Sequence, residues 1–535
     1  MQFALLAVLA LIVVLVTLSK RIGVAYPIVL LLAGLAIGYI PGFPEITLPP
    51  DVVLVIFLPP LLYWESVTAP TSEFRSSAWW IFQLAFGLVI VTTAGVAVVT
   101  HALVPAIGWA AAFVLGAIVS STDEVAFAPI IDRLPVPRHV VATIEGESLV
   151  NDATSLVLYA VAVMAVVTGT FSFAHTLGAL ALSIAGGVAL GLAVGVVAVL
   201  AWRFTDDPSL QVIISIVVPY LAYLPAHLVG ASGVLAVVVT GLFVNRYTPR
   251  VLLPAARERA TGFWVTVVFV TNAVIFVLVG MQFHAIAASL VAYSAGTLIW
   301  YGIAVSLTVI VLRIVWVFAQ ALLPVTNEPE HVEGKADWSH VALLAWSGMR
   351  GGITIAAALA IPFAAATGKF PGRELIIFLT FCVLLATLVG QGGTMPLLIR
   401  WMHVTGDDVD EEEERTALGS TAAAALAEID RIEKQGVVPD GVLDSLRKRF
   451  RSRSWEFGTL DGDARRAARA NALYRDTACA LLQVQRDELI KLRDAGKIDN
   501  TVMRRIQRIL DLETEEIQLS GRAAGRSDIS GQEQA

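Results

Sequence analysis

Long apolar runs, broken by glycine, proline and charge, fill residues 1–403 of the chain. A helix needs about 20 mainly apolar residues to cross the hydrocarbon core of a bilayer. The pattern therefore predicts an all-α polytopic membrane domain of about thirteen transmembrane helices. The runs lie near 3–19, 25–40, 51–66, 79–100, 110–131, 139–168, 175–202, 209–224, 230–245, 262–283, 289–322, 339–362 and 374–402.

Basic residues collect in every second loop between these runs. Eleven fall in alternate loops and two, Lys369 and Arg373, in the loops between. Because Lys and Arg accumulate on the cytoplasmic side, the N-terminus is expected outside and the C-terminal tail in the cytoplasm. The eleven are Lys20, Arg21, Arg75, Arg133, Arg138, Arg203, Arg246, Arg250, Arg257, Arg259 and Lys335. No basic segment precedes the first run, which is interpreted as a retained span rather than a cleaved signal peptide.

The composition fits a membrane domain followed by a polar tail. Hydrophobic residues make up 57% of the 535 positions and charged residues only 15%, against about a quarter in soluble proteins. Residues 404–535 open with an acidic run and hold more than half of the charged residues. Helical patterns near 415–435, 440–456, 463–495 and 499–519 predict a small helical cytoplasmic domain with solvated charge. The net charge of −7 indicates no nucleic-acid surface, and two cysteines give no disulfide framework.

Charged side chains inside the apolar runs are the first candidates for function, because each costs about 3 kcal/mol or more in the hydrocarbon region. Glu65 lies near the end of the third run. Residues 120–123 read Ser-Ser-Thr-Asp, and residues 145–154 hold Glu145, Glu147 and Asp152. A fourth segment, residues 346–352, carries Arg350 among serine and glycine.

Helix spacing organises the segment around Asp152. Ser148 and Asp152 are four residues apart and share a face, which can offer a hydroxyl and a carboxylate to a cation. Glu147 and Asn151 share the neighbouring face. Arg350 needs a buried carboxylate, and Glu147 is the expected partner in a structural ion pair. Arg313, by contrast, is expected towards the end of its long run, with its charged head reaching water.

Two of the apolar runs are interrupted by polar residues and glycine. Freed backbone groups at residues 120–123 and 347–352 are tolerable only where they are buried in protein or line a cavity. The fifth and twelfth runs differ by seven, an odd number, and so cross the membrane in opposite directions. Two broken helices in inverted halves are typical of secondary transporters with a binding site at the membrane midplane.

Oxygen ligands at such breaks favour a small hard cation. If a cation and a proton bind Asp152 mutually exclusively, the site crosses loaded with one or the other, and exchange needs no covalent chemistry. The sequence thus predicts a secondary transporter rather than an enzyme, with no cofactor besides its transported ions. A cation channel and a membrane-anchored sensor are the alternatives. A channel would use repeated rings of pore-lining residues, and a sensor would need neither Asp152 nor the breaks.

These motifs resemble the monovalent cation:proton antiporter family, of the bacterial sodium/proton exchanger type. The resemblance covers residues 1–403, and its most specific element is Glu145 to Asp152. Supporting motifs are Thr122-Asp123, Gly348 to Gly351, Leu58 to Leu62 and Gly230 to Ala236.

The resemblance implies roles for the acidic cluster. Asp152 carries the cation or the proton, Thr122 offers a backbone ligand, and Asp123 supports it. Ser148 matches a side-chain ligand and Glu65 a further contributor. Na⁺, or alternatively K⁺ or Li⁺, is thus expected on oxygens of Asp152, Ser148, Thr122 and Glu65.

The resemblance also implies supporting features. Glu147 and Arg350 match a stabilising ion pair, with Asn151 beside them, and an Asn-Asp pair looks like the electroneutral, one-for-one branch. The family usually has proline after Thr-Asp, where this chain has Glu124, which adds an acid beside the break. A homodimer in the plasma membrane, serving pH and sodium homeostasis, is implied as well. The charged tail, residues 404–535, resembles the regulatory tails of bacterial members.

Overall fold

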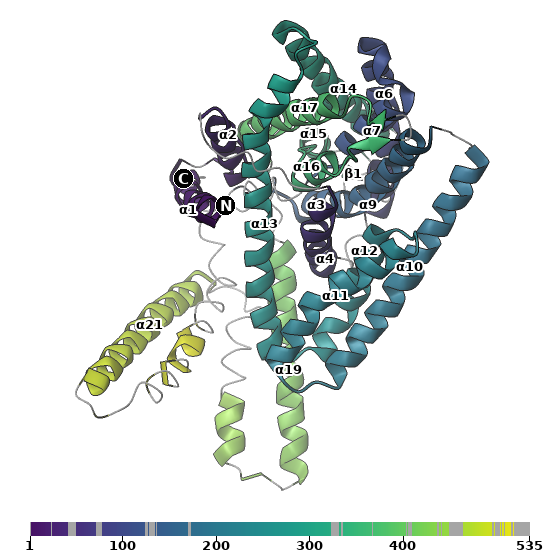
Figure 1. Ribbon diagram of the computed structural model, residues 1–535. Helices are drawn as coiled ribbons and strands as arrows, with labels where there is room; N and C mark the ends of the chain where they lie inside the picture. Colours follow the sequence, from purple (N-terminus) through teal and green to yellow (C-terminus); the bar gives the residue numbers. More distant parts are fainter. Residues whose placement is uncertain are drawn as a thin grey trace. The chain divides into compact units, whose positions relative to one another are not determined.

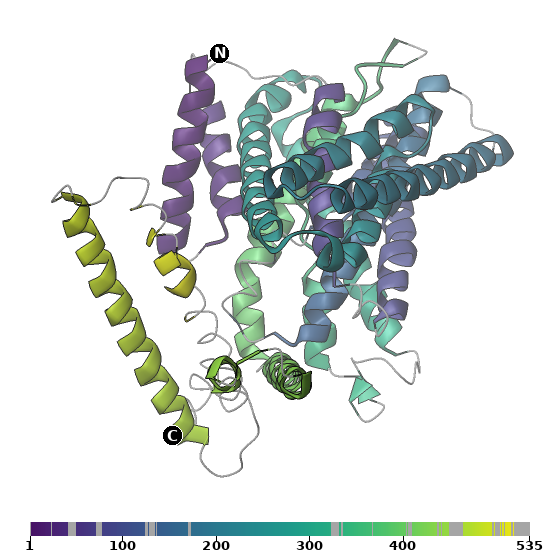
Figure 2. The ribbon, with the colours of Figure 1, turned by 90° about the horizontal axis from the view of Figure 1, so that it is seen from below.

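The computed structural model divides into two compact units, Met1–Gly406 and Asp407–Ala535 (Figure 1; Figure 2 shows the same ribbon turned by 90°). The division falls three residues beyond the predicted start of the tail at 404. The structure describes residues 2–22, 24–40, 50–70, 77–123, 127, 134, 136–169, 173–322, 331–332, 335–336, 338–365, 368–402, 404, 409–435, 438–439, 441–448, 464–494, 497, 503, 506–507, 509–514 and 517.

Every predicted apolar run contains a helix. In the first unit these are α1 (Gln2–Ile22), α2 (Tyr26–Gly38), α3 (Pro50–Ile56), α4 (Leu58–Thr68), α5 (Ala78–Phe82), α6 (Val89–Leu103), α7 (Trp109–Ser120), α9 (Arg138–Thr168), α10 (Phe173–Arg203), α11 (Pro208–Leu228), α12 (Gly233–Val251), α13 (Pro254–Ser289), α14 (Ala295–Ala321), α15 (Trp338–Trp346), α16 (Gly352–Leu359), α17 (Arg373–Leu385) and α18 (Gly393–Trp401). Helix α5 continues into α6 through π-helical Gln83–Leu88, and α17 into α18 through π-helical Ala386–Gly392; Pro105–Ile107 forms a 3₁₀ turn.

The all-helical prediction is confirmed for the membrane unit, with two small exceptions. Antiparallel hairpins join β1 (His331–Val332) to β2 (Lys335–Ala336) and β3 (Ala364–Ala365) to β4 (Gly368–Lys369). Seven helical stretches in the described part are long and apolar enough to cross a membrane by length and composition, and three apolar helices are shorter. The count of about thirteen spans stays a prediction.

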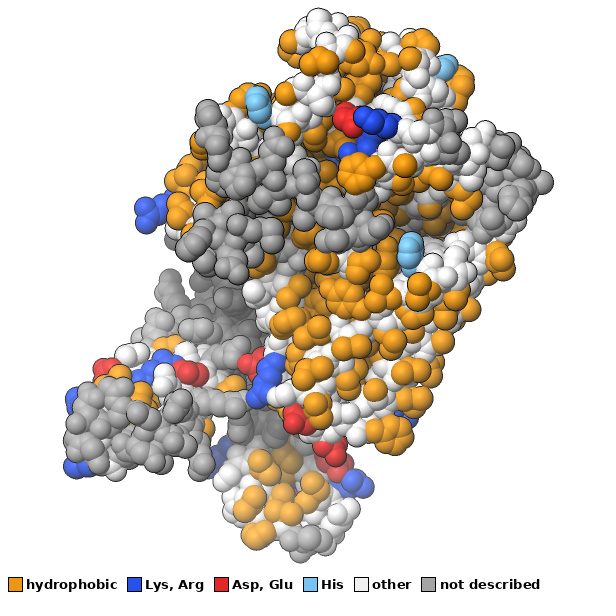
Figure 3. All heavy atoms as spheres, in the orientation of Figure 1, with side chains coloured by type: hydrophobic (Ala, Val, Ile, Leu, Met, Phe, Trp, Pro, Cys, Tyr) orange, Lys and Arg blue, Asp and Glu red, His pale blue; other side chains and the backbone are white. Residues whose placement is uncertain are grey.

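The outer surface of this unit is apolar. Figure 3 shows hydrophobic side chains spread over the visible flank of the helices, with charged side chains gathered near its lower edge. Along α10 and α11, Leu182, Val197 and Ile213 are 76%, 54% and 52% exposed. Helices satisfy their own backbone hydrogen bonds and can present such a surface to lipid. The chain is a multi-pass membrane protein.

Small residues bring neighbouring helices into backbone contact. A Cβ on Gly280 of α13 would lie 2.5 Å from the carbonyl oxygen of Leu31 in α2, and a Cβ on Gly34 of α2 would collide with the Val277 carbonyl. Helices α2 and α13 therefore pack at glycine, as membrane helices often do where small residues line the interface. The aromatic ring of Tyr26 packs on Phe269 along the same seam, with 5.2 Å between ring centroids.

Two histidines that are far apart in the sequence lie side by side at the N-terminal ends of two helices. Nδ1 of His340 lies 3.2 Å from Nε2 of His139. The two residues belong to the first turns of α15 and α9, which are 201 positions apart in the chain. Only a tertiary contact reveals this pair.

The second unit is helical, as predicted. It contains α19 (Val409–Gln435), a helix over 441–448 and α21 (Ala464–Asp494). Arg447 forms ion pairs with Asp430 at 2.7 Å and Glu433 at 2.8 Å, joining the helix over 441–448 to α19. Leu482 and Leu489 of α21 pack with Leu510 in a small apolar cluster. The side chains of the acidic run 407–414 lie outside the described residues.

Candidate functional site

Both predicted breaks are present in the described residues, and they contact each other inside the bundle. Helix α7 ends at Ser120, and residues 121–123 lie outside any helix or strand; α15 ends at Trp346, and α16 begins only at Gly352. The Asp123 N–H donates to the Met349 carbonyl over 2.8 Å. The hydroxyls of Ser121 and Thr354 lie 3.1 Å apart. Each break thus satisfies backbone groups that the other leaves without helical partners. Glu124 and the continuation of the first broken helix lie outside the described residues.

Charges at this crossing face the ends of the half-helices. The N–H of Gly352, at the start of α16, donates to Oδ2 of Asp123 over 2.9 Å. Nε of Arg350 donates to the carbonyl of Val119, in the last turn of α7, over 2.9 Å. A carboxylate at a helix N-terminus and a cation at a helix C-terminus both interact favourably with the helix dipole. Each also satisfies a backbone group left without an intrahelical hydrogen bond.

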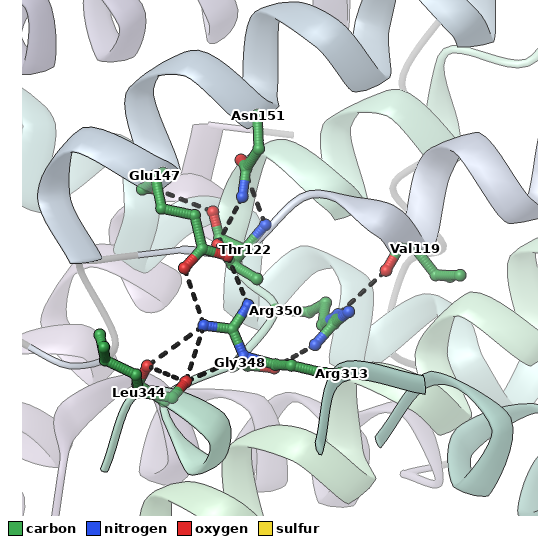
Figure 4. A network of polar contacts seen from close by, with 10 residues as sticks. Val119, Thr122, Glu147, Asn151, Arg313, Leu344, Gly348 and Arg350 are labelled. Atoms are coloured by element: carbon green, nitrogen blue, oxygen red, sulfur yellow. Dashed lines mark hydrogen bonds and ion pairs between the residues drawn. The ribbon is translucent and has the colours of Figure 1, made fainter. Parts of the chain in front are cut away.

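Three side chains of α9 hold Thr122 at the first break (Figure 4). The Asn151 side-chain amide donates to the Thr122 hydroxyl over 2.6 Å, and the Ser148 hydroxyl donates to the Thr122 carbonyl over 2.9 Å. The Thr122 hydroxyl donates to Oε1 of Glu147 over 3.3 Å. The predicted helix faces of Glu147–Asn151 and Ser148–Asp152 therefore come together with Thr122, and all of these residues are buried.

The predicted ion pair is corrected in one partner. Glu147 pairs with Arg313 of α14, not with Arg350 (Figure 4). Both terminal nitrogens of Arg313 donate to the Glu147 carboxylate, with 2.8 Å from Nη2 to Oε2, and Nη2 also donates to the Leu344 carbonyl over 2.9 Å. The planar guanidinium suits this two-point recognition of a carboxylate. Arg313 is 1% exposed, so the expectation that it reaches water is also wrong.

Arg350 instead binds backbone. Its side chain donates to the carbonyls of Val119 and Gly348, and its own N–H donates to the Thr387 hydroxyl over 3.3 Å. Carbonyl oxygens freed by the two breaks thus take the place of the carboxylate that the sequence assigned to it. The sequence did contain a sign that Arg313 is buried. Arg313 lies eight residues before the end of α14, and α14 is apolar on both sides of it. An arginine more than two turns inside such a span needs a buried partner.

Glu65 and Asp152 complete the acidic cluster. Asp152 is 2% exposed and Glu65 8%, so Glu65 does not face water at the interface. The carboxylates of Asp152 and Asp123 each lie within electrostatic range of the Glu65 carboxylate. Oε2 of Glu65 is buried and has no hydrogen-bond partner among the described residues. Two buried carboxylates near a third favour binding of a positive charge.

Buried oxygen atoms of several kinds lie on the segments that form the crossing. Asp152 and Glu65 carry carboxylates, Ser148 a hydroxyl, and Thr122 a carbonyl that lies 2.9 Å from that hydroxyl. No group of three or more His, Cys, Asp and Glu side chains arranged to hold a metal ion occurs among the described residues. A mixed set of carboxylate, hydroxyl and carbonyl oxygens suits a hard monovalent cation that must leave again. Broken helices crossing at a buried acidic cluster define a secondary transporter.

Comparison with known proteins gives the family. The pattern of the family described as "Sodium/hydrogen exchanger, transmembrane" matches residues 7–401. An uncharacterized Na⁺/H⁺ exchanger of Mycobacterium tuberculosis is 34% identical over 528 residues, 96% of this chain and 95% of that protein. The sodium, potassium, lithium and rubidium/H⁺ antiporter of Bacillus pumilus is 32% identical over 386 residues, 70% of this chain and 57% of that one. The chain belongs to the sodium/hydrogen exchanger family.

A solved structure agrees at the level of the fold. The sodium proton antiporter MjNhaP1 from Methanocaldococcus jannaschii superposes with a TM-score of 0.58 and 19% sequence identity. The match covers 75% of this chain and 98% of that structure. The predicted family and fold class are therefore confirmed.

Proposed function

We propose that the protein exchanges Na⁺, or alternatively K⁺ or Li⁺, for H⁺ at the crossing of its broken helices. Asp152 binds either the cation or the proton, and Ser148, Thr122 and Glu65 complete the oxygen ligands. Asp123 supports the site through its bond to Gly352. The observation that carries this proposal is the burial of Asp152 and Glu65, with the half-buried Asp123 near Glu65, inside a chain of the sodium/hydrogen exchanger family.

One-for-one exchange is the second part of the proposal. Of the two buried carboxylates on α9, Glu147 is neutralised by Arg313, which leaves that of Asp152 for transport. Asn151, which precedes Asp152, is committed to Thr122 through its amide. A single carboxylate that carries one cation or one proton moves no net charge over the cycle. The exchange is therefore electroneutral.

The setting of the transporter is proposed on the same grounds. Positive loop residues support a plasma-membrane protein whose N-terminus lies outside and whose tail is cytoplasmic. The family supports a homodimer that serves pH and sodium homeostasis, and the separate helical unit from Asp407 onward supports a regulatory tail.

Ion pulses to sealed vesicles test the proposal. The full-length protein is reconstituted with an acid interior, and Na⁺, Li⁺, K⁺ or choline is added outside while internal pH is recorded. At least one alkali cation is expected to dissipate the gradient faster than choline, and protein-free vesicles are expected to show no difference. A cation channel would instead pass current without proton counterflow, and a sensor would move neither ion; either result contradicts the proposal.

A further inference from the structure

The longest helix carries a buried amide that no part of the proposed site uses. Asn272 lies at the nineteenth of the 36 residues of α13, the middle of a helix that crosses the whole unit. Its side chain is 1% exposed, and its Nδ2 has no hydrogen-bond partner among the described residues. A buried donor left unpaired costs the full desolvation of that group, so such groups are rare in folded proteins.

The place of this amide is set by the second break. A Cβ on Gly352, the first residue of α16, would lie 2.5 Å from Oδ1 of Asn272, so the amide fills the space that a side chain there would need. If the amide is turned round, the nitrogen lies against Gly352 and the oxygen is left without a partner. In either orientation one polar atom touches the start of α16 and the other is unpaired.

Asp123 approaches the same two glycines from the other broken helix. Its Oδ2 accepts from the Gly352 N–H over 2.9 Å, and a Cβ on Gly351 would overlap that carboxylate. Asn272 and Asp123 thus flank the first residue of α16. Tyr26 of α2 lies within electrostatic range of Asp123 and packs on Phe269, one turn before Asn272 on α13. The glycine-packed seam of α2 and α13 therefore faces this junction.

We propose that Asn272 is a positioning residue for Asp123. Its side-chain N–H is a second donor for the Asp123 carboxylate, which joins or replaces the Gly352 N–H as the broken helices shift during exchange. The unpaired amide is then a donor kept for another step of the cycle rather than a packing defect. This inference rests on the proposed exchange site, but it concerns α13, which supplies none of the proposed ligands.

The test separates a positioning role from a structural one, because the two predict opposite effects on stability. Asn272→Ala removes an unpaired polar group, so the unfolding temperature of the full-length protein is expected to stay the same or rise. The apparent KM for Na⁺ in vesicles is expected to rise about tenfold, the effect of losing one hydrogen bond to a charged group. Asn245→Ala is the matched control, because the Asn245 amide donates to the Ala69 carbonyl over 2.9 Å. It is expected to lower the unfolding temperature and to leave the KM unchanged.

A second variant tests the donor itself. Asn272→Asp keeps the shape of the side chain but cannot donate while ionised, whereas its protonated form can donate through O–H. Its exchange rate relative to wild type is therefore expected to recover as pH is lowered, a signature that lost packing would not produce.

Two results would overturn the inference. One is an Asn272→Ala protein whose KM for Na⁺ is unchanged, whether or not the protein is destabilised or slower. The other is an Asn272→Asp protein whose exchange rate relative to wild type does not recover as pH is lowered. Failure of the proposed function looks different, because wild type would then show no cation-driven proton movement, or Asp152→Asn would leave exchange intact.

Discussion

Arg313 and Glu147 show how a charge pair is held in the middle of an apolar bundle. The guanidinium meets the carboxylate with two nitrogens and uses further donors on the Leu344 carbonyl and the Ser347 hydroxyl. Each charged side chain is 1% exposed, so water solvates neither of them. Removing one partner from such a pair is costly because the other charge stays buried without compensation.

A double-mutant cycle on this pair is the first prediction. Glu147→Gln and Arg313→Met are each expected to destabilise the protein by about 3–5 kcal/mol, and the double variant by clearly less than their sum. Unfolding midpoints of the purified protein measure the coupling. Glu147→Gln combined with Arg350→Met serves as the control, and its effects are expected to be nearly additive. Strong coupling to Arg350 and none to Arg313 would contradict the pairing.

At this scale the sequence identifies which residues are polar and buried, but not how they pair. Helical spacing placed Glu147, Ser148, Asn151 and Asp152 on adjacent faces, and the structure keeps them there around Thr122. The choice between Arg313 and Arg350 depends on the distance between α9 and two other helices, which periodicity does not contain. Asn272 was missed for the same reason, since one asparagine in an apolar run has no pattern around it.

At the scale of secondary-structure elements, the sequence predicts the breaks in the helices but not the short hairpins. The two breaks were predictable because polar residues and glycine interrupt otherwise apolar runs, and unpaired backbone is not tolerated in lipid. The short hairpins β1–β2 and β3–β4 were not, because two-residue strands leave no alternation to detect. At the crossing, Gly351 allows close approach: only a residue without a side chain leaves room for the Asp123 carboxylate.

Gly351→Ala is therefore expected to disrupt the crossing. A methyl group at this position overlaps Oδ2 of Asp123, so the carboxylate must leave the Gly352 N–H, and exchange is expected to fall at least tenfold. Gly393→Ala is the matched control, because a Cβ there meets nothing within 4 Å. Vesicle exchange rates compare the two. Equal activity in both variants would show that the contact between the breaks does not matter.

The tail gives a prediction of its own. Arg447 joins two helices through Asp430 and Glu433, and those carboxylates raise the pKa of Arg447 above its ordinary value. A raised pKa means that this stabilisation is fully present at neutral pH and is lost only as pH rises through the folded-state value. Arg447→Ala is thus expected to speed amide hydrogen exchange over 409–448 in the full-length protein, equally at about pH 7 and pH 9.

Arg431→Ala is the control for that measurement. Within the described part of the tail, Arg431 forms its ion pair with Glu428, three residues away on α19, and both side chains are exposed. Exposed pairs within one helix contribute little, so amide exchange over the same segment is expected to stay close to wild type. Equal effects of the two substitutions would show that Arg447 does not join the helices.

At the scale of the whole molecule, the transport cycle should be indifferent to membrane voltage. Each net charge moved across the membrane would couple to the potential by about 2.3 kcal/mol per 100 mV. Exchange of one cation for one proton moves none, so the rate and the final pH gradient in vesicles are expected to be the same with or without an imposed potassium diffusion potential. A final gradient that follows the potential would contradict the one-for-one stoichiometry.

Much of the organisation of the whole molecule was predictable from the sequence. The apolar runs predicted the helices of the membrane unit. The second compact unit begins at Asp407, three residues after the predicted start of the tail at 404, whose regulatory role stays a prediction. The packing of α2 on α13 through Gly34 and Gly280 was not predictable, because small residues occur throughout the apolar block. Sequence patterns of this kind specify which segments enter the membrane, and close contacts then determine which segments lie together.

The most direct measurement compares Na⁺-driven proton movement in vesicles containing Asp152→Asn with that in vesicles containing Asp206→Asn. The two substitutions remove the same charge, one from the buried cluster on α9 and one from the exposed turn between α10 and α11. Asp152→Asn is expected to leave no more exchange than protein-free vesicles, while Asp206→Asn keeps the wild-type rate. Wild-type exchange in Asp152→Asn would contradict the assignment of this aspartate as the shared carrier of cation and proton.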